Sequence, residues 1–165
     1  VLPKNYVKQQ EIEIVVKEMA EQVAARIRRH GCLTQCIHLF IGTAQGESKS
    51  GFSHQMKIPA TDNTKQLASY CLQLFRKYYR GQVVRHMGIT YSKLLFTNSR
   101  QLSLFESPEK AEAEQRLDQI IDQIREKYGF TVIVHATSKL EGARSIPRSH
   151  LVGGHAGGAG GLDGL

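Results

Sequence analysis

Polar and apolar side chains alternate in several short segments of this sequence, the spacing that collects like side chains on one face of a β-sheet. From residue 52 to 58 and from residue 86 to 92, one face is apolar and the other polar. The polar positions are Ser53, Gln55, Lys57, His86, Thr90 and Ser92, with Gly88 leaving room for close approach. Hydroxyl, amide, imidazole and ammonium groups bind phosphate oxygens without reading base sequence. The pattern therefore predicts a sheet surface for a nucleic-acid backbone.

The distribution of charge favours the same interpretation. The 165 residues carry a net charge of +7, with 15 Lys and Arg against 6 Asp and Glu in residues 1–100, and 7 against 9 in residues 101–165. Arg85, near the start of its strand, and Lys93 extend a basic margin beside the polar positions. A net +9 followed by a net −2 predicts that the first part contacts a polyanion. A basic surface that serves only solubility is the alternative.

A second kind of binding chemistry lies in the stretch Gln101, Leu102, Ser103, Leu104 and Phe105. Residues 97–100 before it are polar and turn-forming, and Ser107-Pro108 after it is typical of a helix start. Apolar side chains in such a linker are poorly buried by their own segment. They suggest a peptide that docks into the pocket of a partner, with packing on its own domain as the alternative.

Chemistry of the catalytic kind is not indicated. Cys32, Cys36 and Cys71 lie in apolar runs and are odd in number, which indicates reduced, buried thiols of a cytosolic protein. The histidines are scattered, so no nucleophile with a base and no zinc spacing is found. His150 and His155 are expected to be incidental rather than metal ligands. No apolar run approaches the roughly 18 residues that span a membrane.

Five elements must position the polar face. Apolar spacing predicts a helix over residues 8–30, strands over 33–43 and 52–58, a helix that ends at Gly81, and a strand over 82–96. A stub of strand at Val1 and Leu2 precedes them. The order is that of an α+β, ferredoxin-like β-α-β-β-α-β domain with a truncated first strand. In that arrangement both helices cover one face of the sheet and leave the other open.

The remainder is predicted to be an appendage. Residues 108–128 form a helix with Leu117, Ile120, Ile121 and Ile124 as its buried stripe, and residues 130–137 form a β-branched strand. Glycine-rich sequence from Gly153 onward predicts disorder. The predicted organisation is a domain at 1–96, a linker with the docking peptide at 97–107, a helix-strand appendage at 108–140, and a flexible tail at 141–165.

Several short motifs in this order resemble one protein family. They are Val1-Leu2-Pro3-Lys4-Asn5-Tyr6, Gly51-Phe52-Ser53-His54-Gln55, Val84-Arg85-His86-Met87-Gly88-Ile89, Gln101 to Phe105, Ala136-Thr137-Ser138 and Gly153-Gly154-His155. Together they resemble the C-terminal part of a Y-family translesion DNA polymerase, closest to the UV-mutagenesis-repair (impB/mucB/samB) type of Gram-positive bacteria. The sequence begins at Val1 without Met, so we expect a piece of a longer protein.

The resemblance implies that residues 1–96 are a little-finger domain that grips double-stranded template-primer DNA. The implied DNA-binding residues are Ser53, His54, Gln55, Lys57, Arg85, His86, Thr90, Ser92 and Lys93. The stretch from Gln101 to Phe105 would dock on the sliding clamp (polymerase III beta subunit), with Gln101 at the pocket rim and Leu104 and Phe105 inside. Polymerase catalysis, with Mg²⁺ on paired carboxylates, would belong to domains before Val1. The segment itself would need no cofactor and would act in the cytoplasm at the nucleoid, with no membrane partner.

Two expectations carry alternatives. Because the first strand is truncated, residues 130–137 or a neighbouring copy of the chain are expected to pair with the bare sheet edge, giving strand-exchanged self-association in the second case. A ferredoxin-like regulatory or RNA-binding module is the alternative function, with Phe40 as its one stacking candidate. A small cysteine-dependent enzyme is a third hypothesis and needs a reactive thiolate.

Overall fold

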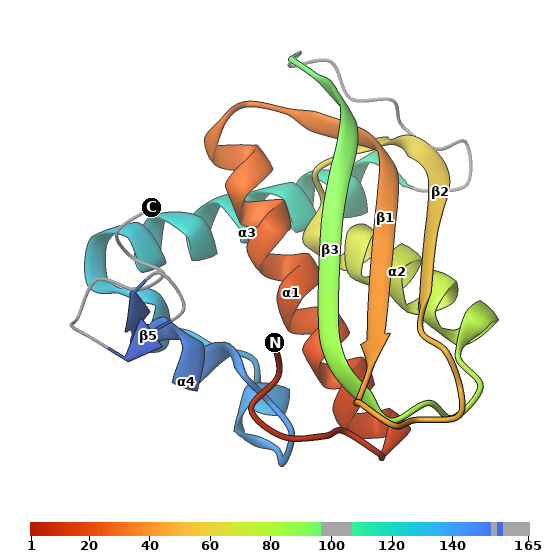
Figure 1. The fold of residues 1–165 in the computed structure, drawn as a ribbon. Helices are drawn as coiled ribbons and strands as arrows, with labels where there is room; N and C mark the ends of the chain where they lie inside the picture. Colours follow the sequence, from red (N-terminus) through yellow and green to blue (C-terminus); the bar gives the residue numbers. More distant parts are fainter. Residues whose placement is uncertain (97–106, 153–154, 157–165) are drawn as a thin grey trace.

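A three-stranded antiparallel sheet organises the molecule (Figure 1). The computed structural model describes residues 1–96, 107–152 and 155–156. Strand β1 (Leu33–Thr43) lies in the centre, β2 (Phe52–Thr61) on one side and β3 (Val84–Leu95) on the other. Their bounds agree with those of the predicted strands to within three residues. The agreement follows because buried and exposed residues alternate along each strand, as the sequence pattern predicts.

Helices α1 (Gln9–Arg29) and α2 (Thr64–Tyr78) cover one face of this sheet and leave the other open, as predicted (Figure 1). The core between the layers contains Ile12, Val16, Ile37, Leu39, Ile41, Leu67, Phe75 and Val84, each at most 1 % exposed. The hydroxyl of Tyr91 crosses the core and donates to the carbonyl oxygen of Ala20 at 2.9 Å. Helix α2 begins where the side chain of Asn63 accepts a hydrogen bond from the amide of Gln66.

The start of the chain runs along the first residues of β3. The amide of Leu2 donates to the carbonyl of Arg85 at 2.8 Å, and Tyr6 and Val84 exchange two backbone hydrogen bonds at 2.9 Å. The stub of strand expected at Val1 and Leu2 is thus reduced to one backbone hydrogen bond from Leu2, and the only bridge of this segment is at Tyr6. Within the described residues, no strand pairs with the outer edge of β3 beyond this point.

A C-terminal unit, residues 107–152, follows the sheet domain. It contains α3 (Pro108–Tyr128), two 3₁₀ turns at Phe130–Val132 and Ala136–Lys139, and α4 (Ser145–Ser149). A two-stranded sheet of β4 (Leu151–Val152) and β5 (His155–Ala156) follows. Helix α3 has its predicted bounds, because Ser107 caps its start and Gly129, at φ +95°, ends it.

The predicted strand over 130–137 was wrong. Its backbone is held by α3 rather than by a strand: the guanidinium of Arg125 donates twice to the carbonyl of Ile133, at 2.8 and 3.0 Å, and lies 4.5 Å from the ring centre of Phe130. This segment does not reach the edge of β3, so the proposed pairing of 130–137 with that edge was wrong as well. β-branched residues favour a strand only where a neighbouring strand is available.

The predicted start of the flexible tail at residue 141 was also wrong. The carboxylate of Glu18 on α1 accepts hydrogen bonds from the amides of Arg144 and Ser145 at 2.6 and 3.0 Å, which fixes the start of α4. The hydroxyl of Tyr6 donates to the carbonyl of Gly142 at 2.8 Å. Residues 142–145 are therefore tied to the sheet domain by partners that lie far away in the sequence.

The apolar stripe predicted on α3 is only partly covered: Ile121 and Ile124 are half-buried, whereas Leu117 and Ile120 are exposed. No residue of this helix is buried, and Leu117 and Ile120 are 56 % and 46 % exposed. Instead, α3 approaches α1 and α2 with the acidic side chains Glu114, Asp118 and Asp122, spaced four residues apart. These acidic side chains form ion pairs with cations of the sheet domain, and the ion pairs orient the helix. The hydrophobic pattern of the helix did not predict this orientation.

Candidate nucleic-acid interface

The register of the three strands arranges the polar side chains of the open face in rows. Cys36 of β1 lies between Lys57 and Ser92, and His38 lies between Gln55 and Thr90. Phe40 lies between Ser53 and Gly88, and Gly42 pairs with His86 at the end of the sheet. We call this surface the open face; its members are Cys36, His38, Phe40, Gly42, Ser53, Gln55, Lys57, His86, Gly88, Thr90 and Ser92.

Six predicted site residues therefore lie together on one surface, with contributions from both outer strands. Two members of the central strand, His38 and Phe40, were not among the predicted DNA-binding residues. Their positions share the odd-even phase of Cys36, which places them opposite the core residues Ile37 and Leu39. That phase was readable in the sequence, but only the pairing of β1 with both neighbours puts these side chains at the centre of the face.

Three predicted residues do not belong to this surface. His54 lies on the helix-covered side of β2, where its ring stacks on Tyr78 with 3.6 Å between ring centres. Arg85 is half-buried in the inward phase of β3. Lys93 is exposed but has a left-handed backbone (φ +52°), an uncommon conformation that interrupts the alternation of β3. The structure thus separates His54, Arg85 and Lys93 from the six that it groups.

The centre of the open face is an exposed aromatic ring between glycines. Phe40 is 43 % exposed. A side chain at Gly42 would place its Cβ 3.1 Å from Cζ of Phe40 and 2.8 Å from Cβ of His86. The ring therefore lies over Gly42 and beside His86, and any larger residue at position 42 would displace both side chains. The face combines one apolar platform with surrounding polar groups.

Carboxylates are absent from the described strands β1, β2 and β3. Ser53 and His38 form a hydrogen bond of 2.7 Å between Oγ and Nε2. Within the described part of the chain, the side chains of Gln55, Lys57, His86, Thr90 and Ser92 make no hydrogen bond or ion pair. No described side chain occupies their donors and acceptors, and the described strands carry no carboxylate that would repel an anionic ligand.

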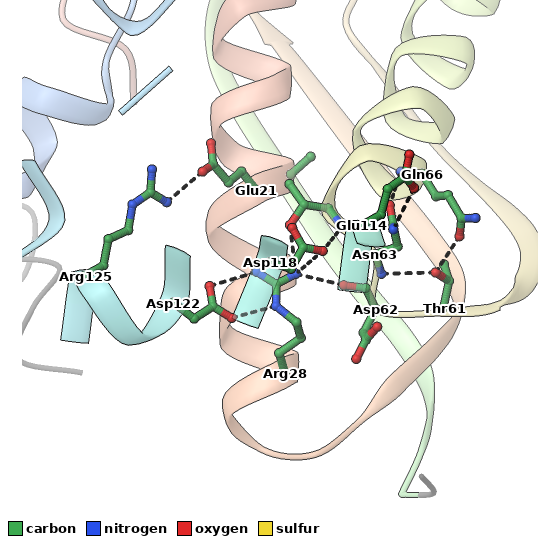
Figure 2. A network of polar contacts seen from close by, with 12 residues as sticks. Glu21, Arg28, Thr61, Asp62, Asn63, Gln66, Glu114, Asp118, Asp122 and Arg125 are labelled. Atoms are coloured by element: carbon green, nitrogen blue, oxygen red, sulfur yellow. Dashed lines mark hydrogen bonds and ion pairs between the residues drawn. The ribbon is translucent and has the colours of Figure 1, made fainter. Parts of the chain in front are cut away.

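On the opposite side of the molecule, charged groups satisfy one another. The guanidinium of Arg28, at the end of α1, binds both carboxylate oxygens of Asp122 at 2.6 and 2.9 Å and contacts Asp118 at 3.4 Å (Figure 2). It also donates to the carbonyl of Asp62 and the hydroxyl of Thr64, both at 2.8 Å. Its side chain is only 8 % exposed. Burial alone would lower the pKa of Arg28, but the bonds to Asp122 and the nearby Asp118 outweigh it and raise that pKa.

Further contacts extend this network along α1 and to the start of α2. Asp118 accepts from the amide of Thr64 at 3.0 Å, and Glu114 accepts from Asn63 and Lys65 (Figure 2). Arg125 binds Glu21 at 2.6 Å. The buried carboxylates of Glu18 and Glu21 on α1 face the C-terminal unit rather than solvent, although Oε1 of Glu18 is buried without a hydrogen-bond partner in the described structure. We call these contacts between α1, α2 and residues 107–152 the docking interface.

The remaining candidates offer no catalytic arrangement in the described residues. The thiols of Cys32, Cys36 and Cys71 are buried, and burial raises the pKa of Cys71 to about 12. No group of three metal-ligating side chains is found within residues 1–96, 107–152 and 155–156. In the same described part, no helix is long and apolar enough to cross a membrane. The predicted docking peptide, Gln101 to Phe105, lies outside the described residues.

Comparison with known proteins gives one family and several relatives. The model of the impB/mucB/samB family C-terminal domain matches residues 1–104. UvrX of Bacillus subtilis, whose name assigns it to UV-damage repair, is 35 % identical over 94 % of the chain. DNA polymerase IV 2 of Halalkalibacterium halodurans is 31 % identical and that of Bacillus subtilis 29 %, each over 93 % of the chain. The chain spans 37 % of the length of each of these three relatives.

Proposed function

The chain belongs to the impB/mucB/samB C-terminal domain family, and from that premise we propose that it is the non-catalytic DNA-binding and clamp-docking module of an error-prone lesion-bypass polymerase. The open face would hold template-primer duplex, and Gln101 to Phe105 would attach the parent enzyme to the sliding clamp. Polymerase activity, with its Mg²⁺, would belong to other domains of the parent protein, which would act in repair of UV-damaged DNA at the bacterial nucleoid.

The observation that carries the DNA-binding proposal is the open face itself. It is uncovered in the described residues, lined by polar side chains from all three strands, and lacks a carboxylate. Contacts of hydroxyl, amide and ammonium groups with phosphates position a protein on duplex without reading its sequence. A polymerase that extends primers on any template needs this kind of grip.

The clamp-docking proposal is supported by the position of the peptide in the chain. The elements on either side of it are described: β3 ends at Leu95, and Ser107 caps α3. The peptide therefore belongs to the connection between the sheet domain and the C-terminal unit. Leu104 and Phe105 would supply the apolar anchors of a short peptide in a hydrophobic pocket.

Duplex binding is tested by fluorescence anisotropy of a labelled primer-template with the full chain at increasing salt. We expect log affinity to fall linearly with log salt and to depend little on base sequence. Equal or tighter binding to single-stranded RNA would instead favour the RNA-binding alternative. The exposed ring of Phe40 at the centre of a β-sheet is the observation on which that alternative depends.

Clamp docking is tested by binding of the chain to an immobilised sliding clamp from a Gram-positive bacterium. Replacement of Leu104 and Phe105 by Ala should abolish binding. The matched control replaces Leu117 and Ile120, two exposed apolar residues of α3, and should leave binding intact. Loss of binding in the control alone would assign clamp docking to α3 instead.

A further inference from the structure

One arginine of the docking interface has no carboxylate partner. Arg28 and Arg125 each bind a carboxylate oxygen at 2.6 Å across the contact between α1 and the C-terminal unit. Arg148, on α4, is half-buried where α4 packs on α1, but its side chain makes no hydrogen bond and no ion pair with the described residues. A guanidinium that is withdrawn from water without a carboxylate in contact destabilises the folded state. An anion bound to Arg148 would relieve this destabilisation.

Backbone hydrogen bonds place further cations beside Arg148. Its amide donates to the carbonyl of Arg144 at 2.9 Å, so the two side chains are one turn of α4 apart. The amide of Arg144 donates in turn to Oε2 of Glu18 at 2.6 Å, which fixes this end of α4 on α1. Gln22 and Arg26 follow Glu18 at intervals of four residues and therefore lie on the same face of α1. We call Gln22, Arg26, Arg144 and Arg148 the arginine cluster.

The electrostatic surroundings of Arg148 agree with this placement. Burial lowers the pKa of Arg148, and the positive charges of Arg144 and Arg26 lower it further, whereas the carboxylate of Glu18 acts in the opposite direction. Three guanidinium groups near one carboxylate leave two positive charges in excess. At Arg28, by contrast, the bonds to Asp122 outweigh burial and raise the pKa.

Nearby polar groups of the chain do not complete the arginine cluster. Nε2 of Gln22 and Oε1 of Glu18 are both buried without a hydrogen-bond partner in the described structure. Oε2 of Glu18 is already used, since it accepts from the amides at the start of α4. Glu11 and Glu141 pair with two lysines near the start of the chain, at 3.6 to 3.9 Å. The described residues thus leave donors in excess and one carboxylate oxygen in need of a donor.

A hydrogen phosphate ion meets both requirements. Its oxygens accept from guanidinium and amide groups, its two negative charges offset the excess of positive charge, and its remaining O–H can donate to Oε1 of Glu18. We propose that the arginine cluster binds a phosphate ion between α1 and α4, with Glu18 accepting a hydrogen bond from it. Because α1 covers the opposite side of the sheet from the open face, this inference goes beyond the proposed DNA binding and does not depend on it.

The experiment measures the melting temperature of the full chain by circular dichroism while phosphate replaces chloride at constant ionic strength. We expect a saturable rise, of about 4 °C when phosphate reaches about ten times its dissociation constant. Sulfate has no O–H at neutral pH and should give a smaller rise at equal concentration. Deoxyadenosine monophosphate, whose dianion also lacks the O–H, should stabilise less than inorganic phosphate. A larger effect of this nucleotide would overturn a site for the free ion.

Substitutions at Arg148 separate the site from general effects of salt. Arg148→Met keeps an apolar side chain and removes the charge. In chloride it should melt at the same temperature as the unmodified chain or higher, and phosphate should no longer give a saturable rise. Arg148→Lys retains the charge without the guanidinium fork and should keep part of the response. Arg116→Met, at an exposed position of α3, is the matched control and should keep the full response.

Exclusion of phosphate from protein surfaces also stabilises folded proteins, but this effect does not saturate and acts on all variants alike. An equal phosphate response of the unmodified chain and Arg148→Met would therefore overturn the inference. A sulfate response as large as that of phosphate would contradict the hydrogen bond to Glu18 and overturn the assignment to phosphate. Failure of duplex binding would overturn the proposed function alone, because the open face takes no part in these measurements.

Discussion

The open face and the docking interface differ in how many partners their polar side chains have within the molecule. On the open face, the polar side chains have few partners in the molecule, and its one lysine has none within the described residues. At the docking interface, Arg28, Asp118, Asp122, Glu21 and Arg125 bind one another at distances down to 2.6 Å (Figure 2). Most hydrogen-bonding groups of the first surface have no partner among the described residues, whereas those of the second surface attach the C-terminal unit.

The difference shows how little a net charge says about a binding surface. Residues 1–100 carry the excess of positive charge, but Arg28 and Lys65 are neutralised by acidic residues of α3. The acidic appendage thus screens cations on the helix side. The proposed binding of DNA to the open face therefore depends on the absence of carboxylates from its strands and on donors without partners among the described residues, not on a concentration of cations.

The largest expected effect concerns the docking interface. Arg28→Gln leaves two carboxylates near a buried site without their cation, and we expect a loss of about 3 kcal/mol in the free energy of unfolding, measured with urea. Arg29→Gln, an exposed neighbour, is the control and should change it little. Equal destabilisation by both substitutions would contradict a specific contribution of the ion pairs of Arg28 to the free energy of unfolding. Duplex affinity per folded molecule should be unchanged in Arg28→Gln if the two surfaces are independent.

A somewhat smaller effect is expected where the C-terminal unit meets the start of α1. Gly142 has φ +92°, and a Cβ there would lie 2.5 Å from Cβ of Glu11. We expect Gly142→Ala to cost about 2 kcal/mol of unfolding free energy, from backbone strain and this clash. Gly46→Ala has φ +82° but no atom within 4 Å, so it measures the backbone contribution alone. A cost no larger than that of Gly46→Ala would show that residues 142–145 adjust freely.

Substitution of one lysine on each surface tests directly which surface binds DNA. Lys57 projects from the open face, whereas Lys65 pairs with Glu114 of α3 at 3.2 Å. Lys57→Ala should reduce the slope of log duplex affinity against log salt by about 1, because one phosphate contact is lost. Lys65→Ala should leave the slope unchanged. The reverse result would place the DNA on the helix side of the domain.

The smallest effect is expected when the buried cysteines of the core between the two surfaces are exposed to a thiol reagent. Burial raises the pKa of the Cys71 thiol to about 12, so very little of this thiol is in the reactive thiolate form near pH 8. A thiol reagent should therefore modify the folded protein slowly at this residue and should react with all three cysteines after unfolding in urea. A rapidly alkylated thiol at neutral pH would revive the hypothesis of a cysteine-dependent enzyme.

Much of the sheet domain could be predicted from its sequence. The strand Leu33–Thr43 has its predicted bounds, and so does the helix Pro108–Tyr128 in the C-terminal unit. The polar phase of β2 and β3 correctly grouped Ser53 with Gln55 and Lys57, and His86 with Thr90 and Ser92. These features depend on interactions within a few residues: alternation across a strand, the spacing of a helical stripe, and the capping of a helix end. Such interactions involve residues that are close together in the sequence.

The tertiary structure alone decided which partner each charged residue obtained. Arg28 binds carboxylates 90 and 94 residues away, and Glu18 holds amides 126 and 127 residues away. These contacts turned the acidic face of α3 toward the domain, replaced the predicted strand at 130–137, and tied down residues 142–145. The local pattern of residues determines which side chains share a face. Whether a charged side chain then faces solvent, a ligand or a distant charge depends on the free energy of bringing two segments together, and the sequence of one segment does not determine that free energy.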